Sequence, residues 1–333
     1  MKAMVLKEFG PIEKGPLEYS EVSTPQPGPT DIQIKIKVCG VCHTDLHTIE
    51  GELPEVSLPV IPGHQIVGTV EKKGEKAERF RKGDRVGVAW LYSTDETCRY
   101  CRRGNENLCE KARFTGYNVN GGYAEFITIP EKFAYPIPDV FSDQEASPLL
   151  CAGIIGYRAL QLSEIHPGQR LGLYGFGASA HVAIQVAVHW GCEVYVFSRS
   201  EEHRALARKL GAVWTGSSKE EPPHKLDSAV NFTPAGPVVL DALNHLDKGG
   251  TQALAGIYMS PIPQMDYTRY LYHERALRSV ANATRKDGEG LLQMAAQIPI
   301  HTTTQLFSLK EANKVLRLLK ESKIDGAAIL KIS

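Results

Sequence analysis

The fold can be predicted from the stretch Leu171-Gly172-Leu173-Tyr174-Gly175-Phe176-Gly177-Ala178-Ser179-Ala180. Its apolar first half is typical of a buried strand, and its glycines open a turn into a helix. The turn fits the pattern G-x-G-x-x-G/A. In that pattern Gly175 permits the tight turn, Gly177 lets the backbone approach a pyrophosphate, and Ala180 allows close helix packing. We therefore expect a dinucleotide to bind where the helix begins, against Gly175, Gly177, Ala178 and Ser179.

The region around this turn alternates predicted strands with predicted helices. Strands are expected at 171–174, 193–197, 228–232 and 251–257, and helices at 178–190, 201–210 and 238–246. Alternation of this length is typical of a parallel, doubly wound α/β sheet of the Rossmann type. The glycine turn lies in the first strand–helix–strand unit of this region, which favours a dinucleotide site over a merely structural turn. We expect a dinucleotide-binding domain over residues 151–282.

The remaining residues are expected to form a β-rich domain. Ile32–Val38 alternates strictly between apolar and polar residues, which is typical of a half-buried strand. Gly83–Val88 has the pattern of a turn followed by a strand. Ser142–Glu145 is a capping box before a helical pattern that runs to residue 162 and is interrupted by Pro148. A second capping box, Ser308–Glu311, opens a helix to about residue 322, before a final strand at 327–332. Residues 1–150 and 283–333 are therefore predicted to form one domain, with the dinucleotide domain inserted between them.

The composition excludes several classes of protein. Lys plus Arg equals Asp plus Glu at 38 each, so no basic excess points to nucleic acid or to an anionic membrane. The N-terminus lacks the apolar run of a signal peptide, and no stretch of about eighteen apolar residues could span a bilayer. Seven cysteines without a secretory signal indicate reduced thiols or metal ligands. We expect a cytoplasmic protein that binds neither nucleic acid nor membrane.

A catalytic zinc site is predicted from three separated residues. Cys42, in the stretch CGVCHTDLH at 39–47, and His64, in PGHQIVG at 62–68, supply two ligands, and Cys151 supplies a third. Catalytic zinc sites take three protein ligands and leave one position open, whereas structural sites usually draw four ligands from one short region. The alternative is that Cys42 and Cys151 are buried apolar cysteines and His64 a satisfied core histidine.

A second metal site is predicted in the polar segment 95–109. Cys98 and Cys101 are separated by two residues and Cys109 follows, in a loop where apolar cysteines have no reason to cluster. Asp95 precedes Cys98 with the same spacing and can complete a closed tetrahedral set, since a carboxylate is an acceptable zinc ligand. A metal there would stabilise a loop with little hydrophobic core of its own.

These motifs together resemble one family, the zinc-dependent alcohol dehydrogenases of the medium-chain dehydrogenase/reductase superfamily. The resemblance covers essentially the whole chain and includes GGYAEF at 121–126, PLLCAG at 148–153 and GFGASA at 175–180. It implies a GroES-like β-rich catalytic domain beside the Rossmann domain, with the active site in a cleft between them. It also implies reversible hydride transfer between a small alcohol, giving an aldehyde or ketone, and a nicotinamide cofactor. Family habit suggests a homodimer or homotetramer.

The resemblance also implies roles for individual residues. Thr44 looks like the hydroxyl that bonds the substrate alcohol, and His47 like the end of a proton relay to solvent. His43 takes the place of a basic residue near the cofactor pyrophosphate, and Asp45 that of a carboxylate behind the metal. Trp90 resembles an aromatic wall of the substrate pocket, and the alternative is that it fills the core.

The chain departs from the family pattern at three places. Gln65 follows the ligand histidine where Glu is usual, so charged ligand exchange at the zinc is in doubt. Asp95 stands where a cysteine is commoner, so a second zinc is expected to bind less tightly. Near the C-terminus Ala327 and Ala328 occupy a region where some members carry an arginine, so Asp45 is expected to lack that partner.

The second predicted strand of the dinucleotide domain bears on the choice of cofactor. An acidic residue at the end of this strand would bond the adenosine ribose and repel a 2′-phosphate. Here Glu193 lies at the opposite end, and the strand runs into Ser198 and Arg199. A hydroxyl and a guanidinium suit a 2′-phosphate, so NADP is predicted over NAD. The alternative is an NAD enzyme in which Arg199 is a solvated charge or stacks on adenine.

Two other functions remain open from the sequence. A zinc-independent quinone or enoyl reductase of the same superfamily would share the fold, but it would not need Cys42, His64 and Cys151 together. A non-enzymatic zinc-binding interaction module would explain the cysteine segment alone and would leave the glycine turn without a purpose.

Overall fold

The stretch at 171–180 forms a strand, a turn and a helix. Strand β10 (Arg170–Tyr174) ends at Gly175, whose φ of 83° lies in the left-handed region, and helix α4 (Ala178–His189) follows with Gly177 as its N-cap. A Cβ at Gly175 would lie 2.9 Å from Cγ2 of Thr233, so only glycine fits this turn without strain. Gly177 has open space where a side chain would project.

Strand β10 is central in a six-stranded sheet with the order β12-β11-β10-β13-β14-β15. All five pairings are parallel. The other strands are β11 (Glu193–Phe197), β12 (Trp214–Gly216), β13 (Leu226–Asn231), β14 (Leu246–Leu254) and β15 (Ala276–Ser279). Reading outward from β10, this is the strand order of the Rossmann fold, so the predicted fold class is confirmed.

Helices connect these strands as the sequence predicts. The predicted connecting helices are α4, α5 (Glu201–Lys209) and α6 (Gly236–His245). Helix α3 (Ile154–Leu162) precedes β10, and the short α7 (Tyr267–Tyr270), between β14 and β15, was not predicted. Two expectations were wrong in detail. Strand β14 begins at Leu246, not Thr251, because Leu246 pairs with Leu226 across an irregularity in the register. The predicted strand also ends three residues early, at Leu254.

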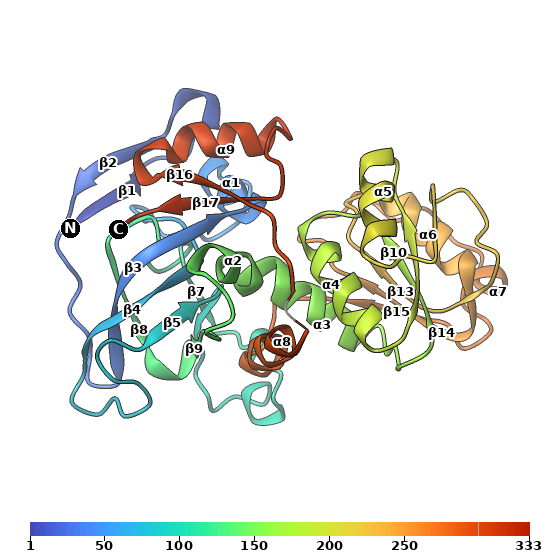
Figure 1. Ribbon diagram of the computed structural model, residues 1–333, viewed down its shortest axis with the longest axis horizontal. Coiled ribbons are helices and arrows are strands. Elements are labelled where there is room, and N and C mark those ends of the chain that lie inside the picture. The colour runs from blue at the N-terminus through green and yellow to red at the C-terminus, as the bar shows by residue number, and fades with distance from the viewer. Residues whose placement is uncertain (299) are drawn as a thin grey trace. The chain divides into compact units, whose positions relative to one another are not determined.

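The described residues, 1–298 and 300–333 of this computed structural model, divide into two compact units. One comprises Ala152–Ala283 and contains the parallel sheet, and the other comprises Met1–Cys151 with Thr284–Ser333. Figure 1 shows the parallel sheet with α4, α5 and α6 around it.

The other unit is built on a mostly antiparallel sheet of seven strands. Its order is β16-β17-β3-β4-β5-β9, with β8 paired to β3. These strands are β3 (Asp31–Val41), β4 (Gln65–Lys73), β5 (Arg85–Val88), β8 (Phe126–Pro130), β9 (Ala134–Pro136), β16 (Thr304–Ser308) and β17 (Ala327–Lys331). The long strand β3 pairs with β4, β8 and β17, so the N-terminal and C-terminal segments share one sheet (Figure 1).

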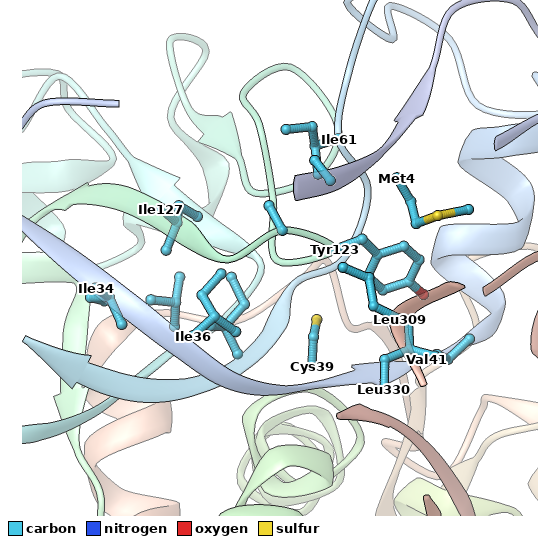
Figure 2. Close-up of a cluster of buried hydrophobic side chains, with 14 of the residues drawn as sticks. Met4, Ile34, Ile36, Cys39, Val41, Ile61, Tyr123, Ile127, Leu309 and Leu330 are labelled. Atoms are coloured by element: carbon cyan, nitrogen blue, oxygen red, sulfur yellow. The ribbon is translucent and has the colours of Figure 1, made fainter. Parts of the chain in front are cut away.

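Smaller elements complete this unit. Two strand pairs, β1 (Lys2–Leu6) with β2 (Leu17–Glu21) and β6 (Leu91–Ser93) with β7 (Arg113–Phe114), lie outside the large sheet. The helices are α1 (His43–Glu50), α2 (Asp143–Pro148), α8 (Arg285–Gln297) and α9 (Ala312–Lys320). Helix α9 packs on β16, β17 and α1. Apolar side chains from these distant segments form one core, which includes Met4, Ile34, Ile36, Cys39, Val41, Ile61, Tyr123, Ile127, Leu309 and Leu330 (Figure 2).

The helical pattern expected from residue 146 to 162 is divided by a π-helical segment. Helix α2 ends at Pro148, residues Leu149–Gly153 are π-helical, and α3 resumes at Ile154. Pro148 was correctly expected to interrupt the helix, because its ring removes a backbone donor. The wider π turn carries Cys151, and such turns occur often at functional sites.

Candidate active site and metal centres

Cys42 caps the helix that carries most of the sequence-predicted active-site residues. It is the N-cap of α1, and its Sγ accepts a hydrogen bond from the backbone N–H of Thr44 at 3.3 Å. The Oδ2 of Asp45 accepts the backbone N–H of Cys42 at 2.9 Å, which closes a capping box. A sulfur fixed by such a cap lies at a defined point beside the helix N-terminus.

The structure brings Cys42, His64 and Cys151 together. The Nε2 of His64 lies 3.4 Å from the Sγ of Cys42 and 3.3 Å from the Sγ of Cys151, and the three ligand atoms all lie within 4.8 Å of one another. A tetrahedral zinc places its nitrogen and sulfur ligands about 3.6 Å apart. These side chains therefore fit a zinc ion.

Without a bound cation, the pKa values of Cys42 and His64 are both shifted toward the protonated forms. Its hydrogen bond with Cys151 and its burial raise the pKa of the Cys42 thiol well above the ordinary value. Burial tends to lower the pKa of His64, but the charges of Asp45 and Cys42 outweigh it and raise that pKa to about 10. The protein groups alone thus oppose the thiolate and neutral imidazole forms that coordinate metals. A divalent cation reverses both preferences.

Two contacts behind the ligands hold them in place. The Oδ1 of Asp45 lies 3.0 Å from Nδ1 of His64, which leaves Nε2 facing the two sulfurs, and it also accepts the backbone N–H of Gly63 at 3.2 Å. Asp45 and His64 side chains are both only 1% exposed. A carboxylate in this position fixes the ring and makes the imidazole a stronger ligand.

The segment with Cys151 is tied to the strand that follows His64. The Oγ of Ser147 on α2 donates to the backbone carbonyl of Gln65 at 2.7 Å. The Gln65 side chain is buried and lies against Gly40 of β3, where a Cβ would be 2.9 Å from its Oε1. Gly40 therefore makes the room that this amide occupies.

The remaining predicted catalytic residues lie on the first turns of α1. Thr44 is half-buried, and among the described residues its hydroxyl forms no hydrogen bond. His43 is exposed. His47 hydrogen-bonds through Nδ1 to the Oε2 of Glu52, which is 56% exposed. Sequence reasoning missed Glu52, although its position just after the end of α1 could have suggested it.

Trp90 stands beside the metal ligands in a small aromatic cluster. Its ring meets the His64 ring edge-on at 4.9 Å, stacks on Phe114 at 5.4 Å and lies 5.5 Å from Tyr117. Phe114 and Tyr117 were not anticipated, because the pairing of β6 with β7 brings them to Trp90 from a later segment. The half-buried rings offer an apolar wall next to His64.

The second predicted metal set also comes together. Asp95, Cys98, Cys101 and Cys109 present ligand atoms within 4.8 Å of one another. The two sulfurs of Cys98 and Cys101 are 3.5 Å apart, and Cys101 Sγ is 3.4 Å from Oδ1 of Asp95. Backbone N–H groups of Cys98 and Thr97 hold the pKa of Asp95 far below its usual range, so this ligand is ionised. The four side chains fit a tetrahedral zinc.

This cysteine lobe, residues 95–109, is attached to α8 by ionic contacts that the sequence did not reveal. The buried carboxylate of Glu106 accepts hydrogen bonds from Arg285. The donors are the backbone N–H of Arg285, at 2.8 Å, and its side-chain Nε and Nη2. Glu96 receives Nη1 of Arg285 at 3.1 Å. The Arg285 guanidinium also lies 4.4 Å from the centre of the Phe133 ring.

The predicted dinucleotide residues gather at the carboxyl edge of the parallel sheet. The backbone N–H of Gly175 donates to the carbonyl of Phe197 at 2.8 Å, so Ser198 and Arg199 follow their strand beside the glycine turn. Gly177 and Ala178 are exposed and Ser179 half-buried at the start of α4. Ser198 is buried, whereas Arg199 is exposed and pairs with no group in the part of the chain that the structure describes.

Comparison with known proteins identifies this arrangement. The family model of the alcohol dehydrogenase GroES-like domain matches residues 28–139, and that of the zinc-binding dehydrogenase domain matches residues 180–297. The chain is 46% identical over 337 residues to a probable alcohol dehydrogenase, AdhA, of Mycobacterium tuberculosis, covering 100% of this chain and 97% of that protein. The chain belongs to the alcohol dehydrogenase family. The resemblance predicted from the sequence motifs is thereby confirmed.

Among the proteins similar to this chain, the names of one relative and one solved structure mention different nicotinamide cofactors. The chain is 31% identical to an NAD-dependent alcohol dehydrogenase of Sulfolobus acidocaldarius, over 100% of both chains. It also resembles the solved structure of CAD from Helicobacter pylori complexed with NADP(H), with a TM-score of 0.86, 25% identity and 99% of each chain covered. No helix in the described ranges is long and apolar enough to cross a membrane.

Proposed function

We propose that this chain is a zinc-dependent alcohol dehydrogenase. It would transfer a hydride from the carbinol carbon of a small alcohol to a nicotinamide cofactor and release a proton, giving an aldehyde or ketone, and would also catalyse the reverse reaction. The observation that carries this proposal is the convergence of Cys42, His64 and Cys151, whose ligand atoms lie within 4.8 Å of one another. Three ligands, with a fourth position left for substrate, is the pattern of a catalytic zinc.

The chain's own residues supply binding and proton handling around that centre. When bound, the zinc would polarise the substrate oxygen and the nicotinamide would accept the hydride. Thr44, with a hydroxyl free for a new partner, would bond the alcohol. His47, held by Glu52 at the exposed end of α1, would pass the released proton to solvent. Trp90, Phe114 and Tyr117 would exclude water from one side of the alcohol.

The closed set Asp95, Cys98, Cys101 and Cys109 supports a second, structural zinc. The unit comprising Met1–Cys151 and Thr284–Ser333 would be the catalytic domain, and Ala152–Ala283 the cofactor domain, with the glycine turn holding the pyrophosphate. His43 remains a predicted cofactor-binding residue. A homodimer or homotetramer in the cytoplasm remains the expected setting, to be tested by sedimentation and by fractionation.

The proposed cofactor is NADP, with NAD as the alternative. Arg199 carries this choice, because its exposed guanidinium lacks a partner among the described residues and follows Ser198 at the sheet edge where an adenosine ribose would lie. One feature opposes it: Glu201 and Glu202 lie in the first turn of α5. The Glu201 charge is matched by ion pairs to Arg204 at 2.8 Å and Arg208 at 2.6 Å, which lessens its repulsion of a phosphate.

A panel of primary, secondary and aromatic alcohols, assayed with NADP and with NAD, tests the function. We expect alcohol-dependent reduction of the cofactor, which disappears with the metal. The rival is a zinc-independent quinone or enoyl reductase. Reduction of quinones or enones at full rate by metal-depleted protein, without alcohol oxidation, would favour that rival.

A further inference from the structure

The carboxylate that orients His64 lacks a lysine or arginine partner among the described residues. Asp45 accepts the backbone N–H groups of Cys42 and Gly63 and contacts Nδ1 of His64, and no lysine or arginine of the described ranges forms an ion pair with it. On strand β17, Ala328 pairs with Val41, and this strand supplies no ion pair to Asp45 among the described residues. In the described part of the chain, the polar groups that hydrogen-bond this buried charge are therefore backbone N–H groups and the His64 ring, not a lysine or arginine.

Tyr123 packs directly on the residue before His64. A Cβ at Gly63 would lie 2.4 Å from Cδ1 and 2.7 Å from Cε1 of Tyr123, so the ring covers Gly63, whose φ is 96°. The backbone N–H of Tyr123 donates to the carbonyl of Pro62 at 2.9 Å, and that of Gly122 to Gly63 at 2.8 Å. The segment that carries Tyr123 is thus bonded to the segment that delivers His64.

The hydroxyl of Tyr123 is buried without a full hydrogen bond. The residue is 0% exposed, and in the described part of the chain its oxygen has no partner in hydrogen-bonding geometry. Burial, followed by the negative charge of Asp45, raises the pKa of Tyr123 well above its usual value, so the hydroxyl keeps its proton and can donate. Figure 2 shows Tyr123 within the buried core, together with Cys39 and Val41.

We propose that Tyr123 is a positioning residue for the catalytic metal: its ring fixes Gly63, and its hydroxyl steadies the Asp45 carboxylate that orients His64. This inference rests on the proposed function, because it concerns the metal held by Cys42, His64 and Cys151. It assigns to Tyr123 the part that a cation beside Asp45 would otherwise play. Groups that orient a ligating histidine alter metal affinity without touching the metal.

The test is the release of Co²⁺ from cobalt-substituted holoenzyme to a chromogenic chelator. Tyr123→Phe keeps the ring and removes only the hydroxyl. We expect it to release the catalytic Co²⁺ on the order of ten-fold faster than the parent and to shift the visible bands of that cobalt. The catalytic phase is identified as the one missing from Cys42→Ser. The matched control is Tyr135→Phe. Tyr135 is also only 3% exposed, and its pKa is raised by burial and by the charges of Glu106 and Glu289 instead of Asp45.

A double-mutant cycle separates this role from general stability. In an Asp45→Asn background, Tyr123→Phe should accelerate Co²⁺ release by less than about two-fold, because the hydroxyl acts through Asp45. Parent-like release and spectrum in Tyr123→Phe, or the same acceleration in both backgrounds, would overturn the inference and leave the proposed function standing. A parent chain whose metal content is unchanged by Cys42→Ser would overturn both.

Discussion

Single residues in this chain perform two tasks at once. Cys42 is both the N-cap of α1 and a proposed metal ligand, and Asp45 both closes the capping box and orients His64. The short motif at 39–47 predicted Cys42 as a metal ligand, whereas helix α1, which Cys42 caps, was not predicted. The sequence did not reveal Phe114 or Tyr123 in their observed positions, because their partners come from segments distant in the sequence. Glu52 was also missed, although its contact with His47 is local.

His47→Gln tests the proton path at the residue scale. Without the imidazole, alcohol oxidation should slow by roughly 10²-fold at lower pH and recover partly as pH rises, because hydroxide then replaces the relay. The measurement is the dependence of kcat on pH in the parent and the variant. Glu52→Gln, which removes the charge that holds Nδ1, should give a smaller loss in the same direction. A variant profile that overlies the parent's would remove His47 from the mechanism.

At the scale of elements, the cysteine lobe depends on metal more than on packing. In residues 95–109 the buried side chains are Glu106, Asn107 and Cys109, which is too little apolar surface to order the segment. Its attachment to α8 runs through Arg285 and the carboxylates of Glu106 and Glu96. The metal set should therefore stabilise the fold without taking part in turnover.

Cys101→Ala should consequently lower Tm more than the initial rate. We expect one zinc per chain instead of two and a Tm lower by roughly 5–10 °C, as a loss of about 2–3 kcal/mol implies for a domain of this size, with the initial rate reduced less than about two-fold. The control, Cys192→Ala, replaces a buried cysteine outside both metal sets and should keep two zinc ions. A parent with a single zinc that Cys101→Ala does not remove would show that the lobe binds no metal.

The turn between β11 and α5 carries Arg199, the residue on which the proposed choice of cofactor depends. Arg199→Ala should lower kcat/KM for NADP by roughly ten- to a hundred-fold, the range expected for one charge-assisted hydrogen bond, and change it little for NAD. Arg170→Ala, at the opposite end of the parallel strands and paired with Glu193 at 3.4 Å, is the control and should preserve the NADP to NAD ratio. Equal losses with both cofactors, or a parent that prefers NAD, would contradict the assignment.

Elements with a clear period were predictable and irregular ones were not. The strand Ile32–Val38 and the helices after β10 and β11 follow their apolar patterns, so their positions were predicted closely. Strands β12 and β15 have three and four residues, too few to show a period, and they form because the neighbouring strands offer open edges. The π turn at Leu149–Gly153 has no sequence signature beyond Pro148.

At the scale of the whole molecule, widely separated segments converge to build one site. The ligands Cys42, His64 and Cys151 come from the start of α1, the segment before β4 and the π-helical turn. All three segments must therefore fold before the site exists. The order and spacing of the motifs were enough to recognise the family. They could not supply the hydrogen bonds from Ser147 to Gln65 and from His64 to Asp45 that hold these segments together.

The central claim is that this convergence creates a catalytic zinc site, and removal and return of the metal tests it most directly. Holoenzyme is stripped with a chelator, then titrated with Zn²⁺ while zinc content and alcohol oxidation are followed together, in the parent and in folded Cys42→Ser. We predict that parent activity falls with the zinc and returns in proportion to its rebinding, whereas Cys42→Ser, with one zinc fewer, stays inactive at every Zn²⁺ concentration. Full alcohol oxidation by zinc-depleted parent, or parent-like activity in Cys42→Ser, would contradict the claim.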